Sequence, residues 1–335
     1  MVTPVWQTRQ LIDQKQERPG EGNNGGEPGG RSWPSPRSGS TRYPHDTEVA
    51  ACSSPPRRPG VRGRPKIGRR QARREDVRVE VVADIDYYKG DDADKIKHKL
   101  DLYLPKGQKD FPVLFFVHGG AWRQGDKNFF GVYSSLGKFY ARRGIGTVVT
   151  NYRLSPKVMH PEHIKDVARA FAWTVRNISK YGGNPAAIFP CGHSAGGHLV
   201  SLLATDRSYL KAEGIDKEEA IRGVIPISGV YRIPERGMQS VFGNDPKVAR
   251  QAGPIEHVRA GLPPFLILYA DRDLAPCGKV PSEAFCKALK DKQCRATAME
   301  IKASNHMKII MTVSRASDPV SDAILGFIAE QTKKR

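Results

Sequence analysis

The sequence predicts an α/β fold, in which a mostly parallel, doubly wound sheet is flanked by helices. Short apolar runs without polar alternation recur along the chain, as expected of strands that are covered on both faces. Helical stretches with an apolar stripe separate these runs, and a parallel sheet requires this alternation. One apolar run passes through Gly-His-Ser-Ala-Gly at residues 192–196 directly into a helical pattern, which indicates a strand, a tight turn and a helix.

The chain divides by composition into a tail, residues 1–75, and one domain, residues 76–335. The tail is rich in Gly, Pro, Ser and Arg and has no sustained apolar period. Such a segment buries too little surface to offset the entropy lost on ordering, so we predict that it is disordered. The formal net charge of the chain is +19, and residues 1–74, with 15 Lys/Arg and 6 Asp/Glu, carry +9 of it.

The most basic part of the tail has two interpretations. Residues 62–66 read Arg-Gly-Arg-Pro-Lys, which resembles the core of an AT-hook, and residues 55–74 hold nine basic and no acidic side chains. This stretch would bind the phosphates of nucleic acid whatever the base sequence. Low-complexity basic tracts produce such pentapeptides easily, so the favoured interpretation is a solvated linker.

Cysteine usage and hydropathy bear on the compartment. The chain has five cysteines, which are widely spaced and include no C-x-x-C pair: Cys52, Cys191, Cys277, Cys286 and Cys294. An odd number at such spacing is typical of reduced thiols in a cytosolic protein rather than of a disulfide scaffold. No apolar run reaches the length of a membrane span, and no signal peptide is visible. We therefore expect a cytoplasmic protein, unless the tail is an artefact of start-site assignment that hides the true N-terminus.

The domain is expected to begin with two strands at one edge of the sheet. Residues 77–88 and 99–105 are β-rich, and a polar turn separates them, which favours an antiparallel pair. Six later strands are predicted from apolar runs: residues 112–117, 145–149, 188–191, 224–228, 265–269 and 296–301. Helices are predicted between and after them: residues 132–140, 161–181, a helix that follows Ser194, and residues 216–221, 282–289 and 320–328.

Residues of unusual chemistry fall where four of these strands end. In such a sheet, ligands gather at the carboxyl ends of the strands. The segments found there are His118-Gly119-Gly120, Ser194, Asp271-Arg272-Asp273 and Ser304-Asn305-His306. A serine on a tight turn becomes a nucleophile when a histidine accepts its proton, and backbone N–H groups at a helix start favour an oxyanion. The four strand ends thus offer an oxyanion loop, a nucleophile, an acid and a base.

The ordered set of these motifs, more than any single one, resembles that of the α/β-hydrolases. Within that fold the chain is similar to the branch of esterases and lipases related to hormone-sensitive lipases and kynurenine formamidases. The matching segments lie between about residue 77 and the C-terminus: His118-Gly119-Gly120-Ala121-Trp122, Asn151-Tyr152-Arg153-Leu154, Gly192-His193-Ser194-Ala195-Gly196-Gly197, Asp273 and His306. They occur in the order Ser, Asp, His that this family uses.

The resemblance implies a role for each matching residue. Ser194 would be the nucleophile, His306 the general base and later the acid, and Asp273 the carboxylate that holds the imidazole tautomer. The backbone N–H groups of Gly120, Ala121 and Ala195 would form the oxyanion hole. Gly119 would shape the loop that carries two of them. No cofactor and no metal are implied. Residues 230–264 are few for a large lipase lid, so a minimal lid is expected.

One departure from the family pattern and one pair of histidines leave alternatives open. The family usually has glycine three residues before the acid, where this chain has Ala270, and Asp271 therefore competes with Asp273. Motif register favours Asp273. His160 and His163 could pair on a metal, but no third ligand is near in sequence, and a role at a helix start is preferred.

Three further residues have ordinary interpretations. His198, one helical turn after Ser194, is expected to be a packed polar group rather than a second base. Trp122 either lines the substrate pocket or packs beneath the oxyanion loop. Pro190 is unusual, because a central strand needs the N–H that proline lacks.

The resemblance implies a serine hydrolase that cleaves carboxylic esters with small or medium acyl chains through an acyl-enzyme. Its partner would be a small-molecule ester. An arylformamidase of the kynurenine formamidase kind, or an esterase of acetylated or feruloylated sugars, would use the same residues. A hypothesis of another class is a non-catalytic hydrolase-fold protein whose basic tail docks on nucleic acid, and the complete triad argues against it.

Overall fold

The computed structural model describes residues 77–216, 220–234 and 236–333. The predicted disordered tail at residues 1–75, its basic pentapeptide at 62–66 and Cys52 lie outside these residues. Residues 217–219, half of the helix predicted at 216–221, also lie outside them.

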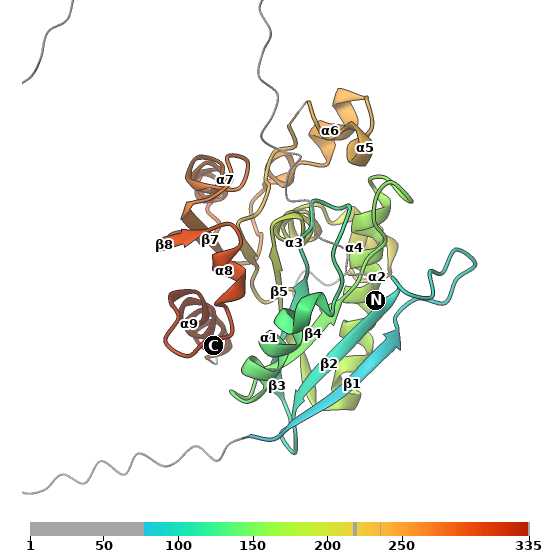
Figure 1. The fold of residues 1–335 in the computed structure, drawn as a ribbon, viewed down its shortest axis with the longest axis vertical. Helices are drawn as coiled ribbons and strands as arrows, with labels where there is room; N and C mark the ends of the chain where they lie inside the picture. The colour runs from blue at the N-terminus through green and yellow to red at the C-terminus, as the bar shows by residue number, and fades with distance from the viewer. Residues whose placement is uncertain (1–76, 217–219, 235, 334–335) are drawn as a thin grey trace, which may run out of the picture. The chain divides into compact units, whose positions relative to one another are not determined.

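The fold is built on an eight-stranded sheet in the order β1-β2-β4-β3-β5-β6-β7-β8. The pairs β1–β2 and β2–β4 are antiparallel, whereas every other neighbouring pair is parallel (Figure 1). The strands are β1 (Val79–Asp86), β2 (Lys99–Pro105), β3 (Phe111–Val117), β4 (Gly146–Thr150), β5 (Gly183–His193), β6 (Ile225–Ile227), β7 (Phe265–Arg272) and β8 (Ala296–Asn305). The predicted fold class and the antiparallel edge pair are confirmed, and β5, β7 and β8 are longer than predicted.

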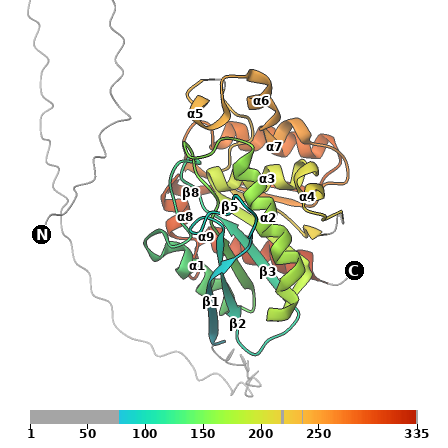
Figure 2. The same cartoon turned by 90° about the vertical axis from the view of Figure 1, so that its right-hand side faces the viewer.

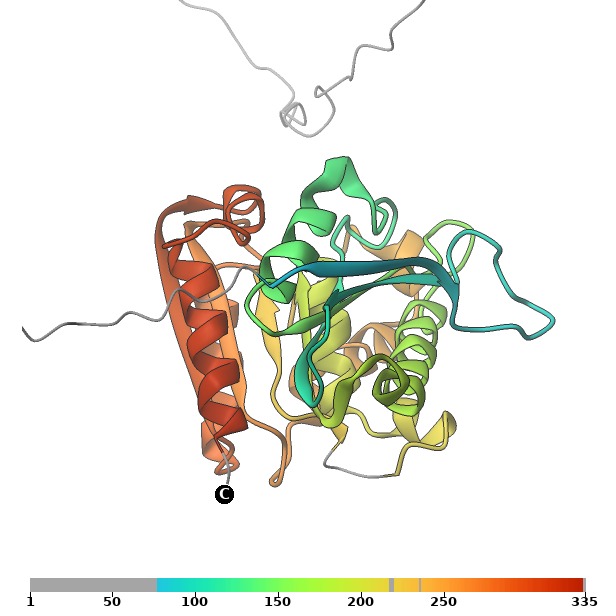
Figure 3. The same ribbon diagram turned by 90° about the horizontal axis from the view of Figure 1, so that it is seen from below.

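Helices cover both faces of this sheet, as Figure 2 and Figure 3 show from two further sides. The helices are α1 (Val132–Ala141), α2 (Glu162–Asn177), α3 (Ala195–Thr205), α4 (Ser208–Ala212), α5 (Gln239–Phe242), α6 (Pro246–Gln251), α7 (Lys279–Asp291), α8 (Lys308–Met311) and α9 (Pro319–Thr332). One apolar core joins α2, α3 and α7 to Phe115 of β3, and a second joins α1, α8 and α9 to Phe116. Because successive strand residues point to opposite faces, β3 must be apolar throughout. No helix among the described residues is long and apolar enough to cross a membrane.

The position of Pro190 in the central strand β5 follows from the length of its neighbour. The N–H of Arg222 donates to Ile188 O, and the N–H of Ser194 donates to Ile227 O. Backbone groups of alternate residues in a parallel strand face the same neighbour, so Pro190 also faces the β6 side. The register with β6 begins only at Cys191, opposite Ile225. Pro190 therefore lies just before the paired part of β5 and β6, where its missing N–H costs no hydrogen bond to β6.

The segment between β6 and β7, predicted as a loose stretch, contains α5, α6 and a 3₁₀ turn at Pro254–His257. Helices of this length are too short to show an apolar period. α6 still carries a local signal, because Asp245 accepts a hydrogen bond from the N–H of Lys247 and Pro246 occupies the first turn. Its six residues make α6 the longest helix in the described part of this segment, which agrees with a minimal lid.

A buried ionic cluster fixes the segment after β4. Arg153 donates through Nε and Nη2 to the two carboxylate oxygens of Asp166 on α2, each at 2.8 Å, and Asp166 is fully buried. His98 Nε2 lies 3.0 Å from the same carboxylate. Two residues after Arg153, the N–H of Ser155 donates to the backbone oxygen of Trp122, in the loop after β3. The cluster thus links the ends of β3 and β4 to α2.

We expect Asp166→Asn to destabilise the fold, because it removes the one fully buried carboxylate that pairs with Arg153 and leaves only the more exposed Asp92 and Glu162 as its counter-ions. Removing one partner of a buried pair costs about 3–5 kcal/mol of unfolding free energy. Chemical denaturation at neutral pH measures it. The control is Lys287→Ala, which breaks the exposed pair with Asp291 and should change the unfolding free energy by less than about 1 kcal/mol. Equal effects of the two substitutions would contradict this account.

The stability that Asp166 provides should depend on pH. Burial opposes its ionisation, but its contacts with His98 and Arg153 outweigh burial and lower its pKa. A carboxyl whose pKa is lower in the folded state stabilises the fold above its unfolded pKa of about 4, and loses this effect as pH falls through the folded pKa. The difference in unfolding free energy between the wild type and Asp166→Asn should therefore be smaller at pH 3 than at pH 7. Chemical denaturation at the two pH values measures it.

Candidate active site

Ser194 occupies the corner between β5 and α3. It has a left-handed backbone with φ of 56°, which a tight turn imposes. A Cβ added to Gly192 would lie 2.4 Å from Gly196 O, and one added to Gly196 would lie 2.1 Å from Val117 O at the end of β3. Only glycine fits at both positions, so the pentapeptide at 192–196 is set by the close approach of three backbone segments.

The structure brings together Ser194, His306 and Asp273, which are far apart in the sequence. His306 Nε2 lies 3.0 Å from Ser194 Oγ, and His306 Nδ1 lies 2.6 Å from Asp273 Oδ1. The Asp273 side chain is fully buried, and 14% of the His306 side chain is exposed. The hydroxyl, the imidazole and the carboxylate form one hydrogen-bonded chain that reaches the surface at its serine end.

Asp273 is held as an anion by several donors. Its Oδ2 accepts hydrogen bonds from Ser228 Oγ at 2.5 Å and from the N–H of Ala270 at 3.0 Å. Burial opposes ionisation of Asp273, but its bonds with His306, Ser228 and Ala270 outweigh burial and lower its pKa. Ala270 takes part only through its backbone, so the departure from glycine there leaves this contact intact. Our sequence analysis missed Ser228, although it ends the predicted strand at 224–228.

Asp271, the competing acid, has a different place. Its two carboxylate oxygens accept hydrogen bonds from the N–H groups of Ala303 and Ser304, at 2.9 and 2.8 Å. Asn305, the residue before His306, accepts hydrogen bonds through Oδ1 from the N–H groups of Met307 and Lys308, which follow His306. Asp271 thus anchors the backbone before His306 and does not contact its ring.

The loop after β3 lies against the serine corner. A Cβ added to Gly119 would lie 3.1 Å from Ser194 Cβ, and Gly120 has φ of 115°, which favours glycine. The N–H groups of Gly120, Ala121 and Ala195 have no hydrogen-bond acceptor among the residues that the structure describes. They are therefore available to a ligand beside Ser194.

His118 holds this loop from beneath. Its Nδ1–H donates to Gly119 O at 2.7 Å, and its ring stacks on Tyr152 at a centroid distance of 4.5 Å. The Tyr152 hydroxyl donates in turn to His118 O. Burial lowers the pKa of His118 to about 4, so the ring is neutral at physiological pH.

The other singled-out residues have structural places. His198 is buried, accepts a hydrogen bond from Trp122 Nε1 and donates to Ala252 O, as expected of a packed polar group. Trp122 is 2% exposed and packs edge-on against His198 and Phe242, which favours packing beneath the loop. His163 Nε2 contacts Ser155 Oγ. In the described ranges, no cluster of His, Cys, Asp and Glu could hold a metal ion.

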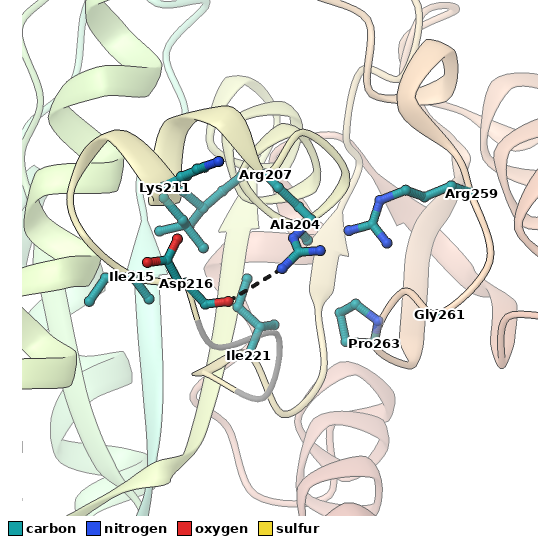
Figure 4. A pocket seen from close by; sticks show the side chains of 11 residues that line it. Ala204, Arg207, Lys211, Ile215, Asp216, Ile221, Arg259, Gly261 and Pro263 are labelled. Atoms are coloured by element: carbon teal, nitrogen blue, oxygen red, sulfur yellow. Dashed lines mark hydrogen bonds between the residues drawn. The ribbon is translucent and has the colours of Figure 1, made fainter.

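A cavity of about 340 Å³ lies between α3, α4 and the loop before β7 (Figure 4). Arg207, Lys211, Asp216 and Arg259 contribute its charged side chains, and Arg207 donates to the backbone oxygen of Asp216. None of the predicted site residues lines this cavity. It belongs to a different part of the domain from the Ser194 corner.

Comparison with known proteins gives a family and a fold. The BD-FAE family matches residues 100–283, a span that contains Ser194 and Asp273 and ends before His306. A truncated carbohydrate esterase from gut microbiota has a solved structure that is similar to this chain with a TM-score of 0.66. The two are 21% identical, and the match covers 78% of this chain and 99% of that one. At this identity the likeness shows the fold alone.

Two curated relatives come from Mycobacterium tuberculosis. Esterase LipC is 30% identical over 270 residues, which cover 73% of this chain and 64% of the relative. The probable carboxylic ester hydrolase LipM is 36% identical over 179 residues, which cover 48% of this chain and 41% of the relative. The chain therefore spans less than two thirds of the length of these relatives.

The family match covers more than half of the chain and agrees with the sheet order. The predicted resemblance to the esterase branch of the α/β-hydrolases is confirmed by the family, by these relatives and by the fold. The chain belongs to the BD-FAE family and has the α/β-hydrolase fold.

Proposed function

We propose that this protein is a serine hydrolase that cleaves carboxylic esters with small or medium acyl chains through an acyl-enzyme. The observation that carries the proposal is the chain of contacts from Asp273 through His306 to Ser194, at 2.6 and 3.0 Å. The mycobacterial relatives LipC and LipM, named an esterase and a probable carboxylic ester hydrolase, support the same chemistry.

In the first half of the reaction, Ser194 Oγ attacks the ester carbonyl while His306 Nε2 takes the hydroxyl proton. The buried Asp273 carboxylate stabilises the imidazolium that forms and keeps the neutral ring protonated on Nδ1. Negative charge develops on the carbonyl oxygen, and the N–H groups of Gly120, Ala121 and Ala195 would bind it. His306 then returns the proton to the departing alcohol, which leaves an acyl group on Ser194.

In the second half, water replaces the alcohol. His306 Nε2 takes a proton from the attacking water, a second oxyanion forms in the same place, and the acid leaves when Ser194 Oγ regains its proton. Neither half needs a group beyond the side chains and backbone donors named here. The short helices α5 and α6 favour small or medium acyl chains, because they offer little cover for a long one.

The proposal includes the domain assignment and the location. The proposed triad and oxyanion residues all lie within residues 76–335, the predicted catalytic domain. The four described cysteines are free and buried, which supports the predicted cytoplasmic location: Cys191, Cys277, Cys286 and Cys294.

Labelling with a fluorophosphonate probe tests the proposal. We expect the wild type to be labelled on Ser194, and Ser194→Ala and His306→Ala to lose both labelling and at least roughly 1,000-fold in ester turnover. Ser135→Ala, at an exposed serine on α1, is the matched control and should react like the wild type. An unlabelled wild type that melts cooperatively would refute the enzyme assignment.

A substrate panel separates the ester proposal from its nearest alternatives. We expect chromogenic acetate and butyrate esters to be cleaved with higher kcat/KM than N-formylkynurenine, acetylated sugars and feruloylated sugars. The comparison is made at one pH with active-site concentration fixed by probe titration. A preference for the formamide or for a sugar ester would keep the triad and replace the substrate class.

The two neighbouring acids should differ sharply on substitution. Asp273→Asn keeps the geometry but favours the wrong histidine tautomer, so we expect kcat to fall by roughly 10,000-fold. Asp271→Asn removes only an anchor of the loop before His306, and we expect less than about a 10-fold loss with a lower melting temperature. Steady-state kinetics and thermal melts measure both. If Asp271→Asn proved the more damaging to kcat, the acid would be misassigned.

A further inference from the structure

His193, the residue between Gly192 and Ser194, makes a contact that the reaction scheme above does not use. Its side chain is buried, with 3% exposed, and its Nε2 lies 2.8 Å from the backbone oxygen of His306. A carbonyl oxygen only accepts, so His193 must donate from Nε2–H. Nδ1 then carries the lone pair of the neutral ring.

The same ring lies between two loops of the site. Its centroid is 4.7 Å from that of His306, with the rings inclined at 41°. On the oxyanion side, a Cβ added to Gly119 would lie 3.0 Å from His193 Nδ1. One side chain adjacent to Ser194 therefore contacts the loop that carries the imidazole and lies close to the loop that offers backbone donors.

Two other side chains also anchor the His306 loop, but they bind N–H groups and not the carbonyl oxygen of His306. Asp271 binds the N–H groups of Ala303 and Ser304, and Asn305 binds those of Met307 and Lys308. These four contacts fix the backbone before and after His306. The peptide carbonyl of His306 itself is held by His193.

A neutral His193 makes this contact without placing a second positive charge beside His306. Burial lowers its pKa to about 3, and the nearby His306 adds to that effect. When His306 takes the proton of Ser194 it becomes positive, and a second positive ring at this distance would oppose that step. A buried imidazole keeps its N–H without adding charge.

We propose that His193 is a positioning residue, which fixes His306 by donating Nε2–H to its carbonyl oxygen and so holds the imidazole in reach of Ser194 Oγ. This inference rests on the proposed function for its kinetic consequence and on the fold alone for its structural one. Truncating the donor should let the ring drift from the serine, and a displacement of about 1 Å costs roughly 100-fold in rate.

Nuclear magnetic resonance on the full chain with ¹⁵N-labelled histidine tests the structural part without any substrate. We expect His193 to show the Nε2–H tautomer, and the proton between His306 Nδ1 and Asp273 to give a low-field signal that is absent in His306→Ala. The signal should persist in His193→Gln, whose amide can still donate, and broaden or vanish in His193→Ala. The Nδ1–H tautomer at His193 in the wild type would overturn the proposal whether or not any variant folds.

Kinetics test the functional part. We expect His193→Ala to lower kcat for a chromogenic ester and the fluorophosphonate labelling rate by roughly 100-fold, with KM changed by less than about 3-fold. His193→Gln should recover at least a tenth of the wild-type rate, and His257→Ala, at a partly exposed histidine, should match the wild type.

The two proposals fail separately. A wild type that the probe does not label would refute the hydrolase assignment, while the His193 tautomer and the low-field signal would still decide the positioning role. Full activity and an unchanged low-field signal in a cooperatively folded His193→Ala would refute the positioning role alone.

Discussion

The whole site depends on how closely three backbone segments approach one another at the Ser194 corner. The end of β3, the end of β5 and the start of α3 meet there with no room for a side chain at residues 192 and 196. This contact places the unpaired N–H groups of the loop after β3 next to those at the start of α3. Backbone packing therefore brings together the N–H donors of the proposed oxyanion hole before any side chain contributes.

Side chains then bring the remaining groups to that corner. The loops after β7 and β8 carry Asp273 and His306, and neither loop contacts β5 through the sheet, because β6 lies between. Polar contacts hold the two loops in place instead. Ser228 donates a hydrogen bond to Asp273, and Asp271 accepts hydrogen bonds from the backbone just before His306. These contacts have a second effect, because each donor to Asp273 makes its buried negative charge less costly. Positioning and charge stabilisation are achieved by the same hydrogen bonds.

The limits of prediction from the sequence follow from the range of each interaction. The strands at 112–117 and 265–269 are recognisable because burial on both faces requires uninterrupted apolar residues, and the strand ends then locate Ser194, Asp273 and His306. The positions of Asp271 and Ser228 depend on distances between loops that no local pattern encodes. The helices α4, α5 and α8 have five residues or fewer, so they show no period and are missed. The place of Pro190 needed the starting point of β6, which is a tertiary fact.

The proposed reaction requires that His306 accepts a proton while the neighbouring imidazoles stay neutral. Three other histidines lie near Ser194, and all of them are buried: His118, His193 and His198. Burial lowers the pKa of His118 to about 4 and the pKa values of His193 and His198 to about 3. All three donate an N–H to a backbone carbonyl, so they act as fixed neutral dipoles. Of these four imidazoles, His306 alone pairs with a carboxylate. In the proposed reaction, His306 would therefore take the proton of Ser194, because it is the one of these four rings that a buried carboxylate would stabilise as the imidazolium.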